Sequence, residues 1–479
     1  MLENQTKKDD STREKREETL VFPTNNRMKI TFYGGARTVT GANYLLESGG
    51  TKLLIDCGLH QGSNYSEDLN FEPFPYSPKE INAVCVTHAH IDHIGRIPQL
   101  VKRGFLGSIY STPPTMDMAE ALLIDAEHIL SEEAEKRELP PIYVIGDIVK
   151  TMGLWKKQLY HQKFIIGPFE VEFYDAGHVL GSSSIVIRAD GKTIVFSGDL
   201  GNTHKPFLKP TEPIQELVDY ALIESTYGGR IHEKIKERKN ELERVIHETI
   251  RKNGVLLIPA FALERTQEMI FELNELVENK KIPNMPVFVD SPLAIKLTAV
   301  YEKYCRDPLY FNNETIDHVN NGDEIFDFPG LRFSLTQEES KSISRVPAPK
   351  VIIAGAGMSQ GGRVLYHEKQ YLGDERNTIL FVGFQAKGSL GRLLVEKNPS
   401  VMIQGERIHV RAHIELIDGY SAHADQAQLV RWISLMKNSI KKTFIVQGEE
   451  NESEALSKKI KDEFGCDTHI PSFGETVVL

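Results

Sequence analysis

The chain has 479 residues, of which 40% are hydrophobic and 26% charged, a composition that excludes a wholly disordered protein. Its formal net charge of −11 excludes a uniformly basic surface, so a nucleic-acid partner would need a local basic patch or bound cations. The four cysteines form no CxxC pair, which argues against a zinc ribbon, and a reducing cytoplasm is the expected location. No apolar run is long enough to cross a membrane.

In chain order, residues 1–27 are crowded with charged side chains and predict a solvated, disordered tail. Short β-branched runs then alternate with amphipathic stretches, a pattern typical of an α/β fold. The predicted strands are Met28–Tyr33, Lys52–Asp56, Ala83–Thr87, Phe169–Tyr174, Thr193–Ser197, Val255–Ile258, Val287–Asp290, Val351–Ala354, Thr378–Val382 and Thr443–Gln447. The predicted helices are Thr115–Glu135, His232–Arg251, Thr266–Asn279, Gln426–Lys437 and Ser453–Phe464. The polar segment Asn312–Gly322 predicts a surface connection.

A dense group of metal-binding side chains, in the sequence HAHIDH, follows the predicted strand Ala83–Thr87. Isolated histidines usually serve packing, but four ligand-type side chains in six residues indicate a metal site. Alternate residues of an extended segment project to one side, so His88 and His90 can hold one ion while Asp92 and His93 reach a second. The cluster therefore predicts two metal positions at the end of a strand.

Two further candidate ligands, His178 and Asp199, follow predicted strands in the same way. Each stands next to a glycine, where the backbone can turn sharply. Alone, either residue is better explained as a turn or capping residue. Together with the histidine cluster, they complete two metal sites.

Further motifs occur along the chain in an unbroken order from about Met28 to the C-terminus. They are Asp56 in LIDCG, Glu224 in ESTYG, PAFA at 259–262, DSP at 290–292, GAGM at 355–358, GFQAKG at 383–388 and SAHAD at 421–425. With the metal cluster, this series resembles the metallo-β-lactamase superfamily, and its second half resembles the β-CASP branch of nucleic-acid hydrolases. The resemblance is to prokaryotic relatives of the mRNA 3′-end-processing endonucleases that lack a KH domain.

The resemblance implies an α/β fold in which an αββα metallo-β-lactamase sandwich carries an inserted α/β β-CASP domain. The sandwich would comprise residues 28–220 and, returning at the C-terminus, residues 421–479. The insert would comprise residues 221–420. The active site is then expected in the cleft between the two, where a thin single strand enters more easily than a duplex.

The resemblance also implies two zinc ions per chain. The first would be bound by His88, His90 and His178, and the second by Asp92 and His93. Asp199 would bridge both ions. Asp56 would orient the ligand loops without touching a metal.

One position departs from the family pattern. Gln447, in the segment FIVQGE, stands where RNA-cleaving members offer a histidine to the second zinc ion. A glutamine amide is neutral and is a weaker zinc ligand than imidazole, so we expect the second site to be weakly occupied or to take another ion such as Mn²⁺. DNA-processing relatives also lack this histidine, so the position does not separate RNA from DNA substrates.

Two divalent ions can activate water and neutralise charge on a phosphoryl oxygen, which makes Asp92 a catalytic candidate through the metal it holds. The leaving oxygen still needs a proton, and His423 is the candidate donor. The resemblance implies that Glu224 orients this histidine and keeps it protonated. Without the other motifs, His423 would be explained as a residue at the start of a helix.

The glycine-rich segment GAGMSQGGR at 355–363 supplies candidate substrate-binding residues. Backbone N–H groups beside glycines can approach phosphate, and arginine can clamp it. The candidates are Ser359, Gly361, Arg363, Arg392 and Lys387. Tight strand–helix packing and surface salt bridges explain the same residues equally well, and the spacing matches neither a dinucleotide fingerprint nor a P-loop.

The preferred hypothesis is a zinc-dependent ribonuclease acting on single-stranded RNA as an endonuclease, with 5′-to-3′ exonuclease activity left open. Three alternatives remain: a DNA-processing nuclease of the same branch, a hydrolase of a small ester, thioester or lactam, and a catalytically decayed RNA-binding subunit. A homodimer is also left open.

Overall fold

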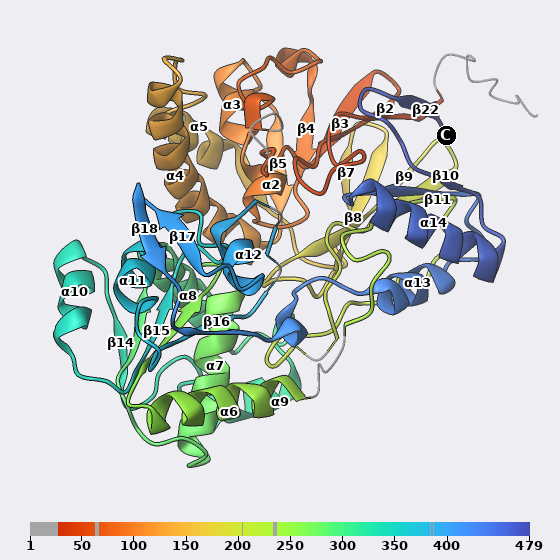
Figure 1. Cartoon of the computed structure of the whole chain (residues 1–479). Coiled ribbons are helices and arrows are strands. Elements are labelled where there is room, and N and C mark those ends of the chain that lie inside the picture. The colour runs from red at the N-terminus through yellow and green to blue at the C-terminus, as the bar shows by residue number, and fades with distance from the viewer. Residues whose placement is uncertain (1–26, 63–66, 204, 233–236, 384, 387) are drawn as a thin grey trace, which may run out of the picture.

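The computed structural model describes residues 27–62, 67–203, 205–232, 237–383, 385–386 and 388–479. The expected N-terminal tail therefore lies outside the described residues except for Arg27, as do positions 233–236 of the expected helix His232–Arg251. Figure 1 shows two parts: a sandwich of two sheets at the top, and a second α/β unit below it.

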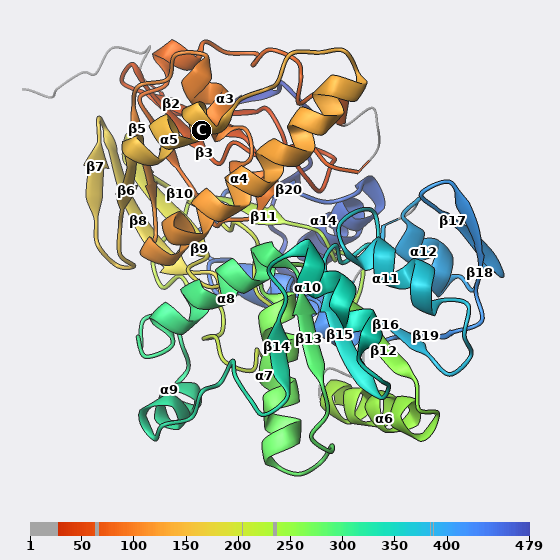
Figure 2. The ribbon, with the colours of Figure 1, turned by 90° about the vertical axis from the view of Figure 1, so that its left-hand side faces the viewer.

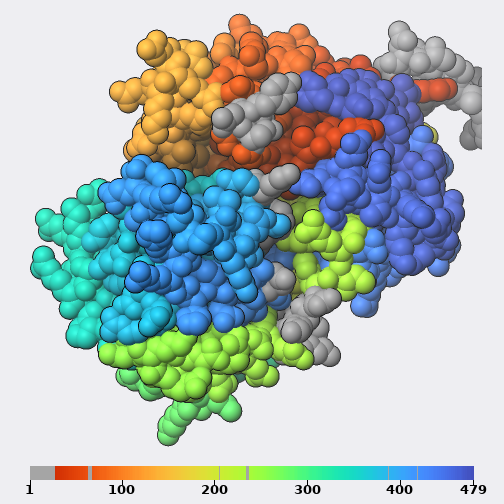
Figure 3. Space-filling model, viewed as in Figure 1, coloured from red at the N-terminus to blue at the C-terminus, as the bar shows by residue number. Residues whose placement is uncertain are grey.

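The sandwich consists of two seven-stranded sheets. The first contains, in spatial order, β22 (Thr476–Val478), β1 (Lys29–Phe32), β2 (Tyr44–Ser48), β3 (Thr51–Ile55), β4 (Ala83–Cys85), β5 (Ser108–Ser111) and β6 (Trp155–Lys157). The second contains β21 (Thr468–His469), β20 (Lys442–Val446), β11 (Tyr220–Glu224), β10 (Lys192–Phe196), β9 (Ser183–Ala189), β8 (Phe169–Asp175) and β7 (Phe164–Ile166). Each sheet contains strands from the first half of the chain and from the C-terminal segment, which therefore completes the sandwich. Figure 3 shows this blue C-terminal segment beside the red N-terminal residues.

The inner faces of the two sheets pack through aromatic side chains. The ring of Phe32 lies 5.3 Å from that of Phe444, and the ring of Tyr44 lies 6.2 Å from that of Phe196. Helices cover the outer faces: α2 (Ile91–Ile94), α3 (Ile97–Lys102), α4 (Pro113–Lys136) and α5 (Ile145–Leu154) on the first sheet, α13 (Gln426–Ser434) and α14 (Glu450–Phe464) on the second. This is the expected αββα arrangement.

The second unit is built on a six-stranded sheet in which all neighbouring strands are parallel. Its strands are, in spatial order, β14 (Leu331–Phe333), β13 (Val287–Asp290), β15 (Lys350–Ala354), β12 (Val255–Pro259), β16 (Thr378–Phe381) and β19 (His413–Leu416). Its helices are α6 (Arg238–Arg251), α7 (Arg265–Glu278), α8 (Pro292–Tyr304), α9 (Asn313–Asn320), α10 (Gln337–Ser342), α11 (Val364–Tyr371) and α12 (Leu390–Val395), and β17 (Ser400–Ile403) pairs with β18 (Glu406–His409) at the edge (Figure 2). The central strands are buried on both faces, as the continuous apolar runs of a helix-covered parallel sheet require.

The predicted strands are all confirmed to within two residues at each end. The segment Asn312–Gly322 was expected as a connection, and this expectation is wrong because it forms α9. The side chain of Asn312 accepts a hydrogen bond from the backbone N–H of Thr315, which caps the helix, and Thr315 and Val319 face the core.

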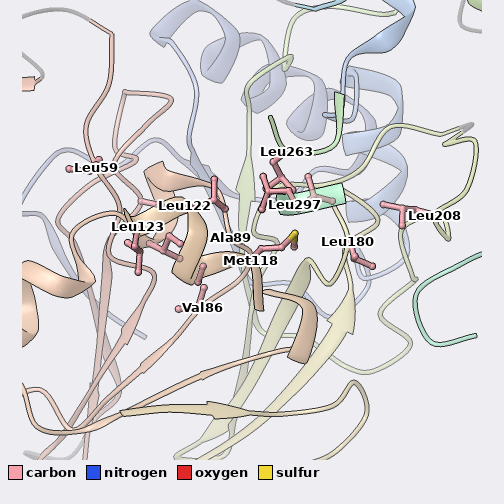
Figure 4. Close-up of a cluster of buried hydrophobic side chains, with 14 of the residues drawn as sticks. Leu59, Val86, Ala89, Met118, Leu122, Leu123, Leu180, Leu208, Leu263 and Leu297 are labelled. Atoms are coloured by element: carbon pink, nitrogen blue, oxygen red, sulfur yellow. The ribbon is translucent and has the colours of Figure 1, made fainter. Parts of the chain in front are cut away.

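One hydrophobic core continues from the sandwich into the second unit. Met118 and Leu122 of α4 belong to the same buried cluster as Leu263 and Leu297 of the second unit (Figure 4). Burying apolar surface stabilises a contact by about 25 cal/mol per Å², so this shared core holds the two units in a fixed arrangement. No helix in the described ranges combines the length and apolar character needed to cross a membrane.

Candidate metal centre and proton donor

Three strand ends deliver a cluster of metal-binding side chains to one place. His88 and His90 follow β4, His178 follows β8, and Asp199 follows β10. One donor atom from each residue lies within 4.8 Å of the others. His88, His178 and Asp199 are buried and His90 is partly exposed, so the group is reached from one side.

The donor atoms of this group are spaced as a tetrahedral ion requires. His90 Nδ1 lies 3.0 Å from His88 Nε2 and 3.2 Å from His178 Nε2. Asp199 Oδ2 lies 3.4 Å and 3.6 Å from the same two nitrogens. Ligand bonds of about 2.0–2.1 Å in a tetrahedron place ligand atoms about 3.3–3.4 Å apart, so the four residues fit Zn²⁺.

The protonation of two of these histidines suits the same purpose. Burial lowers the pKa of His90 and of His178 well below the ordinary value, and the neighbouring histidines lower it further. Both imidazoles are therefore neutral at pH 7, which is the form that binds metal. His178 Nδ1 lies 3.3 Å from the carbonyl oxygen of Ala422, which leaves its Nε2 facing the cluster.

A second group of donors lies on the other side of Asp199. Asp199 Oδ1 lies 3.4 Å from His93 Nε2, and Asp92 Oδ2 lies 3.9 Å from the same nitrogen. The two carboxylate oxygens of Asp199 thus face two different groups, the geometry of a bridging ligand.

Gln447 occupies the end of this second group. Its Nε2 donates a hydrogen bond of 2.8 Å to Asp199 Oδ1 and lies 3.1 Å from His93 Nε2. The hydroxyl of Tyr44 donates to its Oε1 over 3.3 Å, and its backbone N–H donates to the carbonyl of Gly35 over 2.7 Å. The amide is therefore held against the position where a second ion would bind.

Asp56 lies behind the metal-binding side chains. It accepts hydrogen bonds of 2.8 Å from the backbone N–H of Thr87, from the Thr87 hydroxyl and from His93 Nδ1. The last bond turns His93 Nε2 toward Asp199. Sequence reasoning missed Thr87, since a single threonine after a strand gives no signal of such a role.

Partly exposed His423 pairs with buried Glu224 beside the metal-binding group. His423 Nδ1 lies 3.1 Å from Glu224 Oε2 and 3.9 Å from Asp199 Oδ2. Burial lowers the pKa of His423, but the charge of Glu224 and its hydrogen bond, with smaller effects of Asp199 and Asp92, raise it to about 9. His423 is thus a cation at neutral pH and can act as a proton donor. Glu224 is itself held by the backbone N–H of Leu200, which donates to Oε1.

Two of the five expected substrate-binding residues already make hydrogen bonds within the protein. Arg363 donates to Asp290 Oδ1 over 2.7 Å and to the carbonyls of Ser334 and Leu335, so its guanidinium is already engaged. The buried hydroxyl of Ser359 donates to Glu368.

The other three candidates are less constrained. A Cβ atom at Gly361 would meet open space. Arg392 is half-exposed and pairs with Glu396 four residues on. Lys387 lies outside the described residues.

A four-layer sandwich with clustered histidines and carboxylates at its strand ends, beside a protonated histidine, defines a metal-dependent hydrolase. Three family descriptions match the chain in order: "Metallo-beta-lactamase superfamily" at residues 37–221, "Beta-Casp domain" at 266–394 and "Zn-dependent metallo-hydrolase RNA specificity domain" at 407–471. The chain belongs to the β-CASP branch of the metallo-β-lactamase superfamily.

Named relatives cover nearly the whole chain. Ribonuclease TTHA0252 of Thermus thermophilus is 36% identical over 94% of this chain and 100% of its own length. Transcription termination factor FttA of Methanosarcina mazei is 31% identical over 94% of this chain and 72% of its own, and an RNase J-like protein of Methanocaldococcus jannaschii is 31% identical over 93% and 98%. A crystal structure of a protein of unknown function from Enterococcus faecalis, 13% identical, shares the fold with a TM-score of 0.54 over 95% of this chain and 100% of that one.

Proposed function

We propose that this protein is a metal-dependent ribonuclease that hydrolyses phosphodiester bonds of single-stranded RNA, as an endonuclease that can also degrade from the 5′ end. The observation that carries the proposal is the His423–Glu224 pair, which holds a protonated imidazole 3.9 Å from the carboxylate of the metal-binding group. Relatives named as ribonucleases, and the match to an RNA specificity domain that includes His423, support RNA as the substrate.

The metal-binding residues divide into two positions. His88, His90, His178 and Asp199 would hold one zinc ion. Asp92, His93 and the second oxygen of Asp199 would hold another, more weakly, with Mn²⁺ as an alternative. Bound divalent ions would lower the pKa of water and offset negative charge on the phosphoryl group.

The chain's own residues then supply the proton. As water adds to phosphorus and the P–O3′ bond breaks, His423 gives its Nε2 proton to the departing 3′ oxygen, and Glu224 holds the imidazole in place through Nδ1. The products are a 3′-hydroxyl and a 5′-phosphate. The small-substrate alternative is less favoured because such a substrate needs no second unit over the site.

We assign different substrate roles to the five candidates in the second unit. Arg363 fixes the glycine-rich loop through Asp290, so the backbone around Ser359 and Gly361 can contact phosphate. Arg392 and Lys387 are proposed as direct contacts to the RNA backbone.

The test uses matched RNA and DNA oligonucleotides, labelled at the 5′ end or internally, with and without chelator and added Zn²⁺ or Mn²⁺. We expect metal-dependent cleavage of RNA with 5′-phosphorylated products. Internal cuts indicate endonuclease activity, and release of 5′ mononucleotides indicates exonuclease activity. Cleavage of DNA alone, or hydrolysis of thioesters or lactams without RNA cleavage, would overturn the proposal.

A further inference from the structure

Three glutamates at four-residue spacing lie at the start of α7 and along one of its faces. Glu264, Glu268 and Glu272 are each at most 3% exposed, and we refer to them as the acid row. Buried carboxylates are costly unless they are paired. Lys205, Arg265 and Arg238 pair with them, so three negative side chains face three positive ones.

The first end of the acid row holds the loop that carries His178. Lys205 Nζ donates to Glu264 Oε1 over 2.9 Å and to the carbonyl oxygen of His178 over 2.7 Å. The hydroxyl of Tyr301 donates to the other oxygen of Glu264 and accepts from the backbone N–H of Leu180 over 3.4 Å. Glu264, from the second unit, thus holds the segment 178–180 at both ends, through Lys205 and through Tyr301.

The backbone of Glu264 is strained in the conformation that makes these contacts. Its φ is +69°, a left-handed value that a residue with a Cβ rarely adopts. Such strain persists only where the surrounding contacts impose it. Here the ion pair with Lys205 and the bond from Tyr301 are those contacts.

The last glutamate of the row holds the loop that carries His423. The hydroxyl of Tyr420 donates to Glu272, and Arg238 Nε donates to the same carboxylate over 3.0 Å. Arg238 also donates to the carbonyl oxygen of Gly419 over 3.3 Å. Gly419 and Tyr420 directly precede the SAHAD segment, so Glu272 fixes the backbone just before the proton donor.

We propose that the acid row positions the two catalytic loops from the second unit: Glu264 sets the metal ligand His178, and Glu272 sets the proton donor His423. This inference rests on the roles assigned above to those two histidines. The glutamates act through Lys205, Tyr301, Arg238 and Tyr420, and are positioning residues. The two ends of the acid row thereby control separate properties, metal retention and proton donation.

The test compares Glu264→Gln and Glu272→Gln with Glu278→Gln, an exposed glutamate at the end of the same helix. Release of zinc into a colorimetric chelator, kcat and KM on RNA, and the melting temperature are measured for each. We expect Glu264→Gln to speed zinc release by about 10-fold or more, the size of effect seen when a residue that orients a ligand is lost. We expect Glu272→Gln to release zinc like wild type and to lower kcat with little change in KM.

Two milder variants keep the test decisive if a glutamine variant fails to fold. Tyr301→Phe removes only the hydroxyl shared by Glu264 and Leu180, and Tyr420→Phe only the hydroxyl that reaches Glu272. The first should speed zinc release, and the second should lower kcat alone. Equal effects of both variants on both measurements, or no effect on either, overturn the inference. Zinc-binding wild type that cleaves no RNA contradicts the proposed function instead, and leaves the zinc-release comparison valid.

Discussion

Gln447 donates its side-chain amide to Asp199 Oδ1 over 2.8 Å. The same carboxylate offers its other oxygen to His88 and His178, so it connects a complete group of donors with an incomplete one. A neutral amide stands at the incomplete end, where a third strong ligand would be required for tight zinc binding.

The Gln447→His variant should therefore bind more metal. Imidazole is a stronger zinc ligand than an amide, so we expect the zinc content of the purified protein to rise toward two ions per chain, above that of wild type. Elemental analysis after gel filtration measures it. Gln447→Ala, which removes the amide without adding a ligand, should not raise the content, and an unchanged content in Gln447→His contradicts the assignment of the second position.

His423→Ala should slow catalysis without releasing metal. Loss of a general acid costs about 10²–10⁴-fold in rate, while none of the strongest metal-binding donors is removed. Single-turnover cleavage of RNA and zinc content, measured on the same preparation, check both parts. A variant that cleaves at the wild-type rate excludes His423 as the proton donor.

Glu224→Gln should move the alkaline limb of the pH–rate profile to lower pH. The negative charge of Glu224 helps to raise the pKa of His423 to about 9, and activity that needs protonated His423 is lost as pH rises through that pKa. Removing the charge lowers the pKa, so activity falls earlier. An alkaline limb in the same place for both proteins would show that His423 is not the group titrating.

Arg363 and Arg392 should behave differently although both were expected to clamp phosphate. Arg363→Ala leaves the buried Asp290 without its guanidinium partner and should cost about 1–3 kcal/mol of unfolding free energy. Arg392→Ala breaks an exposed pair and should change stability by less than about 0.5 kcal/mol, while raising KM for RNA in a salt-dependent way. Denaturant unfolding and RNA titrations separate the two; equal stability of both variants contradicts this view of Arg363.

Glu368 should make stability depend on pH. Burial raises its pKa to about 8, a shift that the hydrogen bond from Ser359 only partly offsets. Because the folded state then binds more protons than the unfolded state, the free energy of unfolding falls as pH rises from the ordinary carboxyl range through about 8, by about 1.4 kcal/mol per unit of pKa difference. Glu368→Gln should remove this loss, so its melting temperature should gain on wild type between pH 5.5 and 8.5; a constant difference argues against a raised pKa.

Much of the fold could be predicted from the sequence because its signals are local. The buried strands are β-branched runs, and the candidate ligands His88, His178 and Asp199 each follow such a run within a few residues. The family resemblance then implied a domain inserted within a sandwich, an arrangement that no local pattern indicates.

The contacts that depend on distant residues could not be predicted. Thr87 and Lys205 give no signal in the sequence, since their roles arise when separate loops meet. Arg363 was expected to clamp phosphate because its neighbours are glycines. Its guanidinium instead donates to Asp290, at the end of a strand distant in the sequence. Acidic residues on a helix usually form a solvated face. Here the acid row is buried and pairs with Lys205 of the sandwich and with Arg265 and Arg238 of the second unit.

The central claim, metal-dependent hydrolysis of RNA at this centre, is tested most directly by comparing wild type with Asp92→Asn on one 5′-labelled RNA. Asp317→Asn, an exposed position on α9, is the control. We predict that wild type and the control lose activity to chelator and regain it with added Zn²⁺ or Mn²⁺, and that Asp92→Asn stays at least about 10²-fold slower at every metal concentration. Equal cleavage by wild type and Asp92→Asn, or cleavage that chelation does not affect, contradicts the claim.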